Sequence, residues 1–307
     1  MVPMHDARMP AAPPADATTL HATLLDWYAH HARDLPWREP GCSPWGVLVS
    51  EVMLQQTPVS RVLPRWREWM ERWPRPADLA AAAPGEAVRH WQSLGYPRRA
   101  LRLHAAAVAI VERHGGRVPE EHAELLALPG VGAYTAAAVA AFAFRQRHAV
   151  VDTNVRRVLA RAVTGAAEPA PSLSAAEVRL AADLLPADAE ESATWGVAVM
   201  ELGALVCTAR APRCERCPLA GRCAWRLAGS PAHDGPAKRV QRWAGTDRQV
   251  RGRLLAVLRE APGPVPAAAL EAAWPADPVQ RARCLDGLVA DGLVEPLGDG
   301  RFALPGA

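Results

Sequence analysis

Four cysteines in the last third of the chain constrain its folding more than any other feature. Cys207, Cys214, Cys217 and Cys223 follow the spacing C-x6-C-x2-C-x5-C. Four thiolates so close in sequence are a complete ligand set for one metal centre, either a [4Fe–4S] cluster or a structural zinc ion. Because protein ligands fill every position, the centre is expected to be closed to substrates and to fix the loop that carries it.

The composition is that of a globular protein without membrane spans. The chain has 307 residues, half of them apolar, which is enough for two modest domains or three small ones. Its first 17 residues are rich in Pro and Ala and lack the basic start and apolar core of a secretion signal, so we expect a disordered tail. We expect the protein in the cytosol, where thiols stay reduced, and Cys42 and Cys284 to be inert.

Arginine carries almost all of the positive charge of the chain. A net charge of +3 is by itself a weak indication of a nucleic-acid partner. Lys238 is the only lysine. A mechanism that needs a lysine amine as its nucleophile therefore has a single side chain to draw on.

Helical spacing of apolar residues dominates the chain and predicts an all-α fold. The predicted helices cover residues 19–33, 43–56, 58–72, 86–93, 98–114, 123–127, 134–144, 154–163, 175–184 and 192–206.

The C-terminal part of the sequence is organised differently. Residues 229–245 lack periodicity and are interpreted as a linker. Residues 246–307 predict helices at 247–260, 266–274 and 278–291, followed by a short hairpin around Gly298-Asp299-Gly300. Three helices and a hairpin resemble a winged helix, but many small domains share this pattern, so DNA binding by this segment is left open.

A glycine-rich turn precedes an acidic residue at a fixed distance. Residues 128–132 read L-P-G-V-G, and Asp152 follows twenty residues after the second glycine. The glycines permit positive φ and a close approach to a phosphate, which the first N–H groups of the next helix would face. Such a contact positions DNA without reading its sequence. The alternative is an ordinary turn between packed helices, which Tyr134, Asp152 and the cysteines together disfavour.

These features resemble the helix-hairpin-helix DNA glycosylases, the superfamily that includes endonuclease III, and most closely its adenine DNA glycosylase branch. The resemblance covers roughly residues 20 to 226, and the combined motifs are specific although each alone is not. The matching segments are Leu35 to Arg38, Ser50 to Thr57, Gly95-Tyr96, Leu128 to Gly132 with Tyr134, Val151 to Val155 and Glu201 to Ala204. The cysteine spacing is that of the superfamily's cluster, so the resemblance implies a [4Fe–4S] cofactor with the four cysteines as ligands.

The resemblance also implies a domain layout and a partner. A six-helix domain is expected at 43–150, and a cluster domain from 18–42 together with 151–228. The linker and the winged-helix-like segment at 246–307 would follow. The expected partner is double-stranded DNA that contains a mispaired adenine. We expect a monomer without membrane attachment, associated with the nucleoid in a bacterial cytoplasm.

Two carboxylates carry the implied chemistry. Glu51 resembles the general acid that protonates adenine, and Asp152 the carboxylate that stabilises the positively charged sugar as the glycosidic bond breaks. One protonated and one ionised carboxyl group is a recurring solution for glycoside hydrolysis. The alternatives are a surface position for Glu51, which its apolar neighbours disfavour, and a helix N-cap for Asp152, which is compatible with catalysis.

The remaining roles come from the resemblance alone. Tyr134 and Asn154 match the residues that hold the Asp and the attacking water, and Gln56 and Tyr96 those that wedge into the base stack. The expected wall of the adenine pocket comprises Arg33, Trp37 and Arg38, although core packing of Trp37 is an alternative. The expected phosphate contacts are Gly130, Val131 and Gly132.

Tyr134 also indicates which reaction the enzyme performs. Bifunctional members of the superfamily attack the sugar with a lysine after the hairpin and then cut the strand. Tyr134 stands where that lysine would be, and Lys238 lies in the predicted linker. We therefore predict a monofunctional glycosylase that uses water and has no β-lyase activity.

Three departures from the branch leave alternatives open. Residues 246–307 are too short for the Nudix-like domain that reads 8-oxoguanine in typical members. Val197 replaces a Gln or Glu near the adenine and cannot form a side-chain hydrogen bond, and Pro97 stands where a second tyrosine is common. The alternatives are a glycosylase for another mispaired base, such as thymine opposite guanine, and a non-catalytic iron–sulfur DNA-binding protein.

Overall fold

The computed structural model describes residues 17–233, 235 and 243–306. The predicted N-terminal tail, most of the second half of the predicted linker and Lys238 lie outside these residues. The chain divides into two compact units, one from Met1–Asp34 with Arg145–Gly235 and the other from Leu35–Phe144 with Pro236–Ala307. We call them the cysteine unit and the hairpin unit. The domain limits expected from the sequence stay a prediction.

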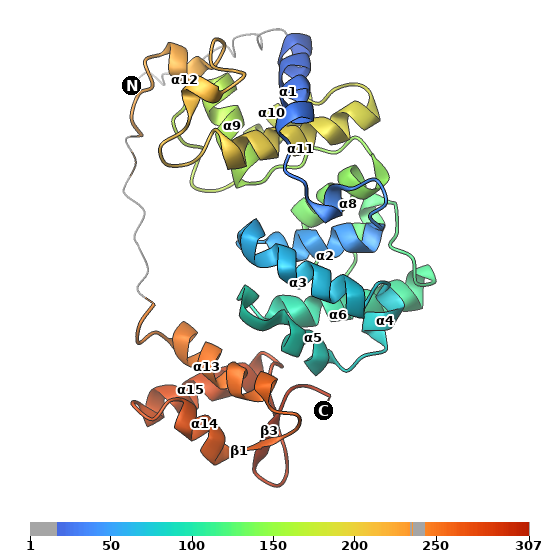
Figure 1. Cartoon of the computed structure of the whole chain (residues 1–307), viewed down its shortest axis with the longest axis vertical. Helices are drawn as coiled ribbons and strands as arrows, with labels where there is room; N and C mark the ends of the chain where they lie inside the picture. Colours follow the sequence, from blue (N-terminus) through green and yellow to red (C-terminus); the bar gives the residue numbers. More distant parts are fainter. Residues whose placement is uncertain (1–16, 234, 236–242, 307) are drawn as a thin grey trace, which may run out of the picture. The chain divides into compact units, whose positions relative to one another are not determined.

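The cysteine unit is built around one long helix. Helix α11 (Ala189–Leu205) packs against α1 (Ala17–His31) and α9 (Thr153–Leu159), as Figure 1 shows. Smaller elements are a π-helical turn at Ala160–Thr164, α10 (Ala175–Asp183), a 3-10 turn at Cys214–Arg216 and α12 (Ala224–Leu227). Buried Leu24, Trp27 and Leu202 belong to its core. The predicted helices of this unit are confirmed, apart from shifts at their ends.

The hairpin unit is helical through residue 144, and prolines open several of its helices. Proline stands in the first turn of α2 (Pro44–Leu54), α4 (Pro76–Ala80) and α5 (Pro84–Trp91), where its missing N–H needs no partner. The other elements are 3-10 turns at Pro36–Arg38 and Gln92–Leu94, α3 (Val59–Arg72), α6 (Arg98–His114), α7 (His122–Leu126) and α8 (Ala133–Phe144). Helix α4 was not predicted from the sequence.

The end of the chain forms a small helical segment with a three-stranded sheet. Its elements are α13 (Asp247–Glu260), β1 (Val265–Pro266), α14 (Ala267–Ala273), α15 (Pro278–Ala290), β2 (Glu295–Pro296) and β3 (Arg301–Ala303). The sheet is antiparallel in the order β1-β3-β2. The three helices and the hairpin are confirmed. Strand β1 was not predicted, since two residues cannot show alternation.

This C-terminal segment shares the hydrophobic core of the hairpin unit. Helix α13 packs on α5, and two arginines cross the contact in opposite directions. Arg89 donates to the carbonyl oxygen of Ala261 at 2.7 Å, and Arg259 donates to that of Val88 at 2.9 Å. Gly85 also donates its N–H to the carbonyl of Pro305 at 2.7 Å. The segment is therefore fixed to α5 by buried polar contacts as well as apolar packing.

No helix in the described part of the chain combines the length and the apolar character needed to cross a lipid bilayer.

Candidate functional site

Glu51 lies in a buried position in the hairpin unit. It belongs to α2, and the residue is only 5 % exposed. The hydroxyl of Tyr134, in the first turn of α8, donates to Glu51 Oε2 at 2.9 Å. The surface alternative for Glu51 is thereby excluded. A buried carboxyl group with a hydroxyl donor has the surroundings expected of a catalytic acid.

The hairpin between α7 and α8 uses its two glycines differently. Gly130 has a φ of +75°, and an added Cβ would lie 2.6 Å from Arg102 Cβ, so no larger residue fits. Gly132 is exposed, and an added Cβ would meet nothing within 4 Å. The first glycine is thus needed for the fold. The second leaves the start of α8 open to a ligand.

Two exposed turns of the hairpin unit carry Gln56 and Tyr96. Both residues have positive φ, +55° and +47°, which is unfavourable for residues other than glycine. Tyr96 is 51 % exposed. These are the two side chains expected to wedge into DNA, and each is presented to solvent by a strained backbone.

Arg99 holds these two turns together. Its guanidinium donates to the carbonyl oxygens of Gln55 at 2.7 Å and Gly95 at 3.1 Å, and to the hydroxyl of Thr57 at 3.0 Å. Further acceptors are the carbonyls of Val52, Met53 and Leu94. Burial lowers the pKa of Arg99 to about 10, so it stays charged at neutral pH. We infer that this buried cation fixes the positions of Gln56 and Tyr96.

Asp152 caps α9 in the cysteine unit. Its Oδ1 accepts from the backbone N–H of Asn154 at 2.8 Å and of Val155 at 2.7 Å, and its Oδ2 accepts from Asn154 Nδ2 at 2.8 Å. The N-cap alternative is therefore correct, and it leaves a catalytic role open. Burial raises the pKa of Asp152, whereas these hydrogen bonds and the charge of Arg157 act to lower it.

Arg157 connects this carboxylate to the cysteine loop. Its Nη2 donates to Asn154 Oδ1 and to the carbonyl of Gly203, each at 2.7 Å, and its Nε donates to the carbonyl of Cys207 at 2.7 Å. The residue is only 8 % exposed. One buried guanidinium thus orients Asn154 on one side and the start of the cysteine loop on the other.

The four cysteines are partly buried, without disulfides, on a loop with several internal hydrogen bonds. Burial raises the pKa of Cys217 to about 11, and the other three cysteines contribute because their charges would repel its thiolate. Burial also raises the pKa of Cys207, whereas Arg161, whose Nη1 lies 3.6 Å from Cys207 Sγ, and Arg157 act to lower it. Four mutually interacting thiols beside buried arginines fit an anionic metal–sulfur centre.

Three expected pocket residues are placed in different surroundings. Arg33 forms a bidentate ion pair with fully buried Glu201, at 2.7 Å for both guanidinium contacts. Trp37 is only 6 % exposed and packs edge-on against Trp66 in the core of the hairpin unit, as its packing alternative anticipated. Arg38 is half-buried. Their assignment to a base pocket stays a prediction.

The sequence alone did not indicate that Arg99 and Arg157 are buried. Arg99 stands three residues after Tyr96, and Arg157 three after Asn154, but a helical arginine is usually a surface residue. The only available signal was their nearness to the motif residues. Tertiary structure was needed to show that their donors are directed inward.

Comparisons with known proteins agree with this arrangement. Residues 49–181 match the family described as HhH-GPD superfamily base excision DNA repair protein, and residues 207–223 match the iron–sulfur binding domain of endonuclease III. The second match begins and ends at the outer cysteines. A [4Fe–4S] cluster is therefore the cofactor of this chain, and a set of four soft thiolate ligands suits it chemically.

The relatives extend over nearly the whole sequence. An adenine DNA glycosylase of Mycolicibacterium smegmatis is 58% identical over 92% of this chain and 95% of its own length. One of Mycobacterium tuberculosis is 57% identical over 92% of each chain. The structure of a thermostable thymine-DNA glycosylase is similar with a TM-score of 0.62 and 28% identity, over 69% of this chain and 97% of that one.

Proposed function

Because the chain belongs to the adenine DNA glycosylase family, a base excision repair family of the HhH-GPD superfamily, we propose that it hydrolyses the N-glycosidic bond of adenine mispaired with 8-oxoguanine or guanine. The observation that carries the proposal is buried Glu51 with the hydroxyl of Tyr134 at 2.9 Å. A protein that only bound DNA would gain nothing from burying a carboxyl group there.

In the proposed mechanism Glu51 is the general acid. Excision of adenine requires protonation of the base, because neutral adenine is a better leaving group than its anion. A protonated Glu51 can accept the Tyr134 hydrogen bond on Oε2 and still carry a proton on Oε1. Tyr134 then fixes the orientation of the acid.

Asp152 takes the second role in the proposed mechanism. The departing base leaves positive charge on the sugar, and an ionised carboxylate stabilises that charge. Three hydrogen bonds to Asp152, two of them from backbone N–H groups at the start of α9, support its ionised form against the effect of burial. Asn154 holds one carboxylate oxygen and, on the family's pattern, the attacking water.

Water is the proposed nucleophile, so an abasic site is the product and the strand stays intact. The position that a lysine occupies in bifunctional members holds Tyr134, whose hydroxyl is directed to Glu51. A phenol cannot form a Schiff base. We propose on this ground that the enzyme has no β-lyase activity.

The cluster has a structural role in this proposal. Cys207, Cys214, Cys217 and Cys223 would hold it, and iron–thiolate bonds would fix the shape of their loop. The same loop carries four arginines that can then contact phosphates: Arg210, Arg213, Arg216 and Arg222. We further propose that the enzyme acts as a monomer on nucleoid DNA.

Single-turnover excision tests the proposed function. Labelled duplexes would carry A·8-oxoguanine, A·G, A·C or T·G, each analysed with and without alkali, beside Glu51→Gln. We expect fastest excision of adenine opposite 8-oxoguanine, strand breaks only after alkali, and a Glu51→Gln variant that binds DNA without excising. Wild-type excision rates for Glu51→Gln, or breaks without alkali, would contradict the mechanism.

Thymine opposite guanine is a second candidate target. Val197 lies in α11, is 8 % exposed and offers no polar group to adenine. The solved structure similar to this chain at 28% identity is that of a thymine-DNA glycosylase. Excision from T·G with adenine left intact would support this candidate instead.

A further inference from the structure

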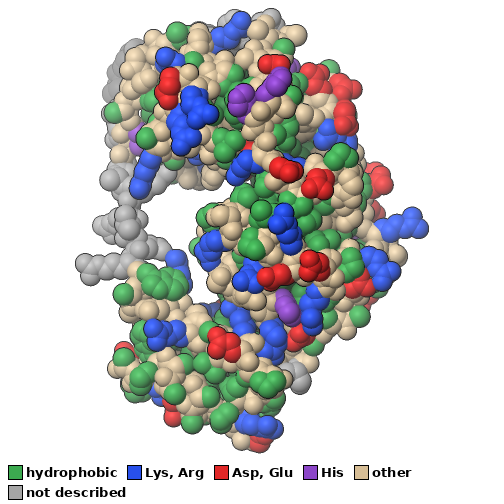
Figure 2. Space-filling view, in the orientation of Figure 1, with side chains coloured by type: hydrophobic (Ala, Val, Ile, Leu, Met, Phe, Trp, Pro, Cys, Tyr) green, Lys and Arg blue, Asp and Glu red, His purple; other side chains and the backbone are tan. Residues whose placement is uncertain are grey.

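An arginine-lined groove runs between the turn that joins α5 to α6 and the first helix of the C-terminal segment. It lies entirely within the hairpin unit and has a volume of about 1500 Å³. Nine arginines line it, against two carboxylates, Glu260 and Asp291. Over the face of the molecule that Figure 2 shows, basic and acidic side chains are mixed. The groove is therefore a local concentration of positive charge.

Two of the groove's arginines are paired with backbone carbonyls and, in the part of the chain that the structure describes, not with carboxylates. Arg99 and Arg259 have carbonyl or hydroxyl acceptors, and no ion pair to a carboxylate is found for either among the described residues. A carbonyl dipole satisfies a guanidinium's hydrogen bonds without cancelling its charge. These buried cations therefore contribute to the positive potential in the groove.

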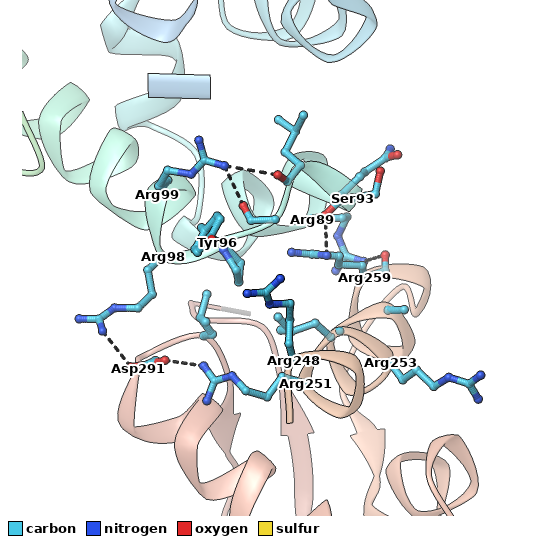
Figure 3. Close-up of a pocket in the computed structure, with 18 of the residues that line it drawn as sticks. Arg89, Ser93, Tyr96, Arg98, Arg99, Arg248, Arg251, Arg253, Arg259 and Asp291 are labelled. Atoms are coloured by element: carbon cyan, nitrogen blue, oxygen red, sulfur yellow. Dashed lines mark hydrogen bonds and ion pairs between the residues drawn. The ribbon is translucent and has the colours of Figure 1, made fainter. Parts of the chain in front are cut away.

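One carboxylate of the groove, that of Asp291, is paired with two arginines. Arg98, at the start of α6, lies 3.1 Å from Asp291 Oδ1, and Arg251 of α13 pairs with Asp291 Oδ2. Figure 3 shows both arginines reaching the same carboxylate from opposite sides. The two walls are thereby held in register, and the single carboxylate is shared between two cations.

The groove has space at two glycines, where the phosphate backbone of a ligand could approach the protein main chain. Gly95 and Gly252 both line it, and a Cβ added to either would meet nothing within 4 Å. Gln56 and Tyr96, the proposed wedge, also line it. A chain of phosphates that leaves the wedge thus has space beside both glycines and positive charge along α13.

The third helix of the segment, which enters DNA in many winged-helix proteins, is less suited to this role here. On α15, both arginines are paired with carboxylates, Arg283 with Asp247 at 2.8 Å and Arg281 with Glu271 at 3.9 Å. On α13, Arg248 and Arg253 are exposed, with Arg253 stacked over the Trp274 ring at 5.6 Å. The basic surface of the segment is on its first helix.

We propose that this groove binds the phosphodiester backbone of duplex DNA beside the wedge residues, so that α13 helps to hold the substrate. The proposal rests on the proposed function, because it takes DNA as the substrate. It gives the C-terminal segment a role that the sequence left open. Contacts to phosphates are independent of sequence, so they would add affinity without base selectivity.

The test is the salt dependence of binding of the full-length protein to an undamaged labelled duplex, measured by fluorescence anisotropy. Arg248→Gln with Arg253→Gln removes two cations from the groove. The matched control, Arg67→Gln with Arg113→Gln, removes two exposed cations outside it. Gly252→Glu places a carboxylate in the groove without disturbing packing, and Gly252→Ala is its control.

We expect the slope of log Kobs against log salt concentration to fall in magnitude by about 1.8 for the groove pair, since each phosphate contact contributes about 0.9. Affinity near 0.1 M salt should fall on the order of tenfold or more, and Gly252→Glu should weaken binding similarly. Both controls should bind as the wild type does.

Unchanged binding by the groove pair and Gly252→Glu would overturn the proposal, as would an equal loss in the Arg67 and Arg113 control. Saturable binding of a mononucleotide, lost in Gly252→Glu, would also overturn it in favour of a small-anion site. Undamaged duplex needs no excision, so these outcomes are independent of the excision assay. Failure of adenine excision would refute the proposed function while leaving a groove effect measurable.

Discussion

Replacing Arg157 by Gln should reduce the excision rate more than the same replacement of its neighbour Arg156. The change removes the donors to Asn154 Oδ1 and to the carbonyls of Gly203 and Cys207. Leaving a buried acceptor without a partner costs about 1–3 kcal/mol, so three of them predict a loss of about 3 kcal/mol or more of unfolding free energy. At roughly 2–4 °C per kcal/mol, Tm should fall by about 6–12 °C.

The catalytic consequence of this change has a definite sign. Asp152 must be ionised to stabilise the sugar cation, and the charge of Arg157 lowers its pKa. Without that charge the pKa of Asp152 rises further, so a smaller fraction is ionised at a given low pH. The acid limb of the single-turnover rate should therefore move to higher pH. At neutral pH the loss of a positioning partner should reduce the rate about 10- to 100-fold.

Arg156→Gln is the matched control for this experiment. Arg156 precedes Arg157 on α9, but it pairs with Glu177 and donates to the carbonyls of Ala170 and Ser172, away from Asp152 and the cysteine loop. It should lose stability while keeping the wild-type acid limb. The assays are thermal unfolding and excision rate against pH. The reasoning would be refuted if both variants gave the same acid limb and the same rate.

Three further predictions concern the wedge, the hairpin and the cluster. Arg99→Met should lower Tm and weaken binding to mispaired duplex, since it removes the donors shared by the two wedge turns; unchanged binding would contradict its positioning role. Gly130→Ala should cost about 2 kcal/mol in denaturant unfolding, from its positive φ and the Arg102 contact. Gly132→Ala should leave stability unchanged but weaken DNA binding. A larger loss of stability in Gly132→Ala than in Gly130→Ala would show that the roles of the two glycines are assigned wrongly. Cys217→Ser should reduce both the iron per chain and the visible absorbance, and full iron content would exclude it as a ligand.

The sequence by itself determined the class of fold and predicted which residues carry the chemistry. Local periodicity predicted the helices, including the three of the C-terminal segment, because apolar spacing is a property of neighbouring residues. The cysteine spacing indicated a four-thiolate centre, and the family comparison agrees. Glu51 and Asp152 were singled out because carboxyl groups stood within recognisable motifs.

Only the tertiary structure decided how these residues are supported. Buried Arg99 and Arg157 join segments that are far apart in sequence, and no periodic pattern distinguishes them from surface arginines. The packing of the C-terminal segment is a second case, because it shares a hydrophobic core with α5, and Arg89 and Arg259 find carbonyl acceptors across the contact. Periodicity describes which face of a helix is apolar, whereas the partner of a buried polar group is set by the packing of distant segments.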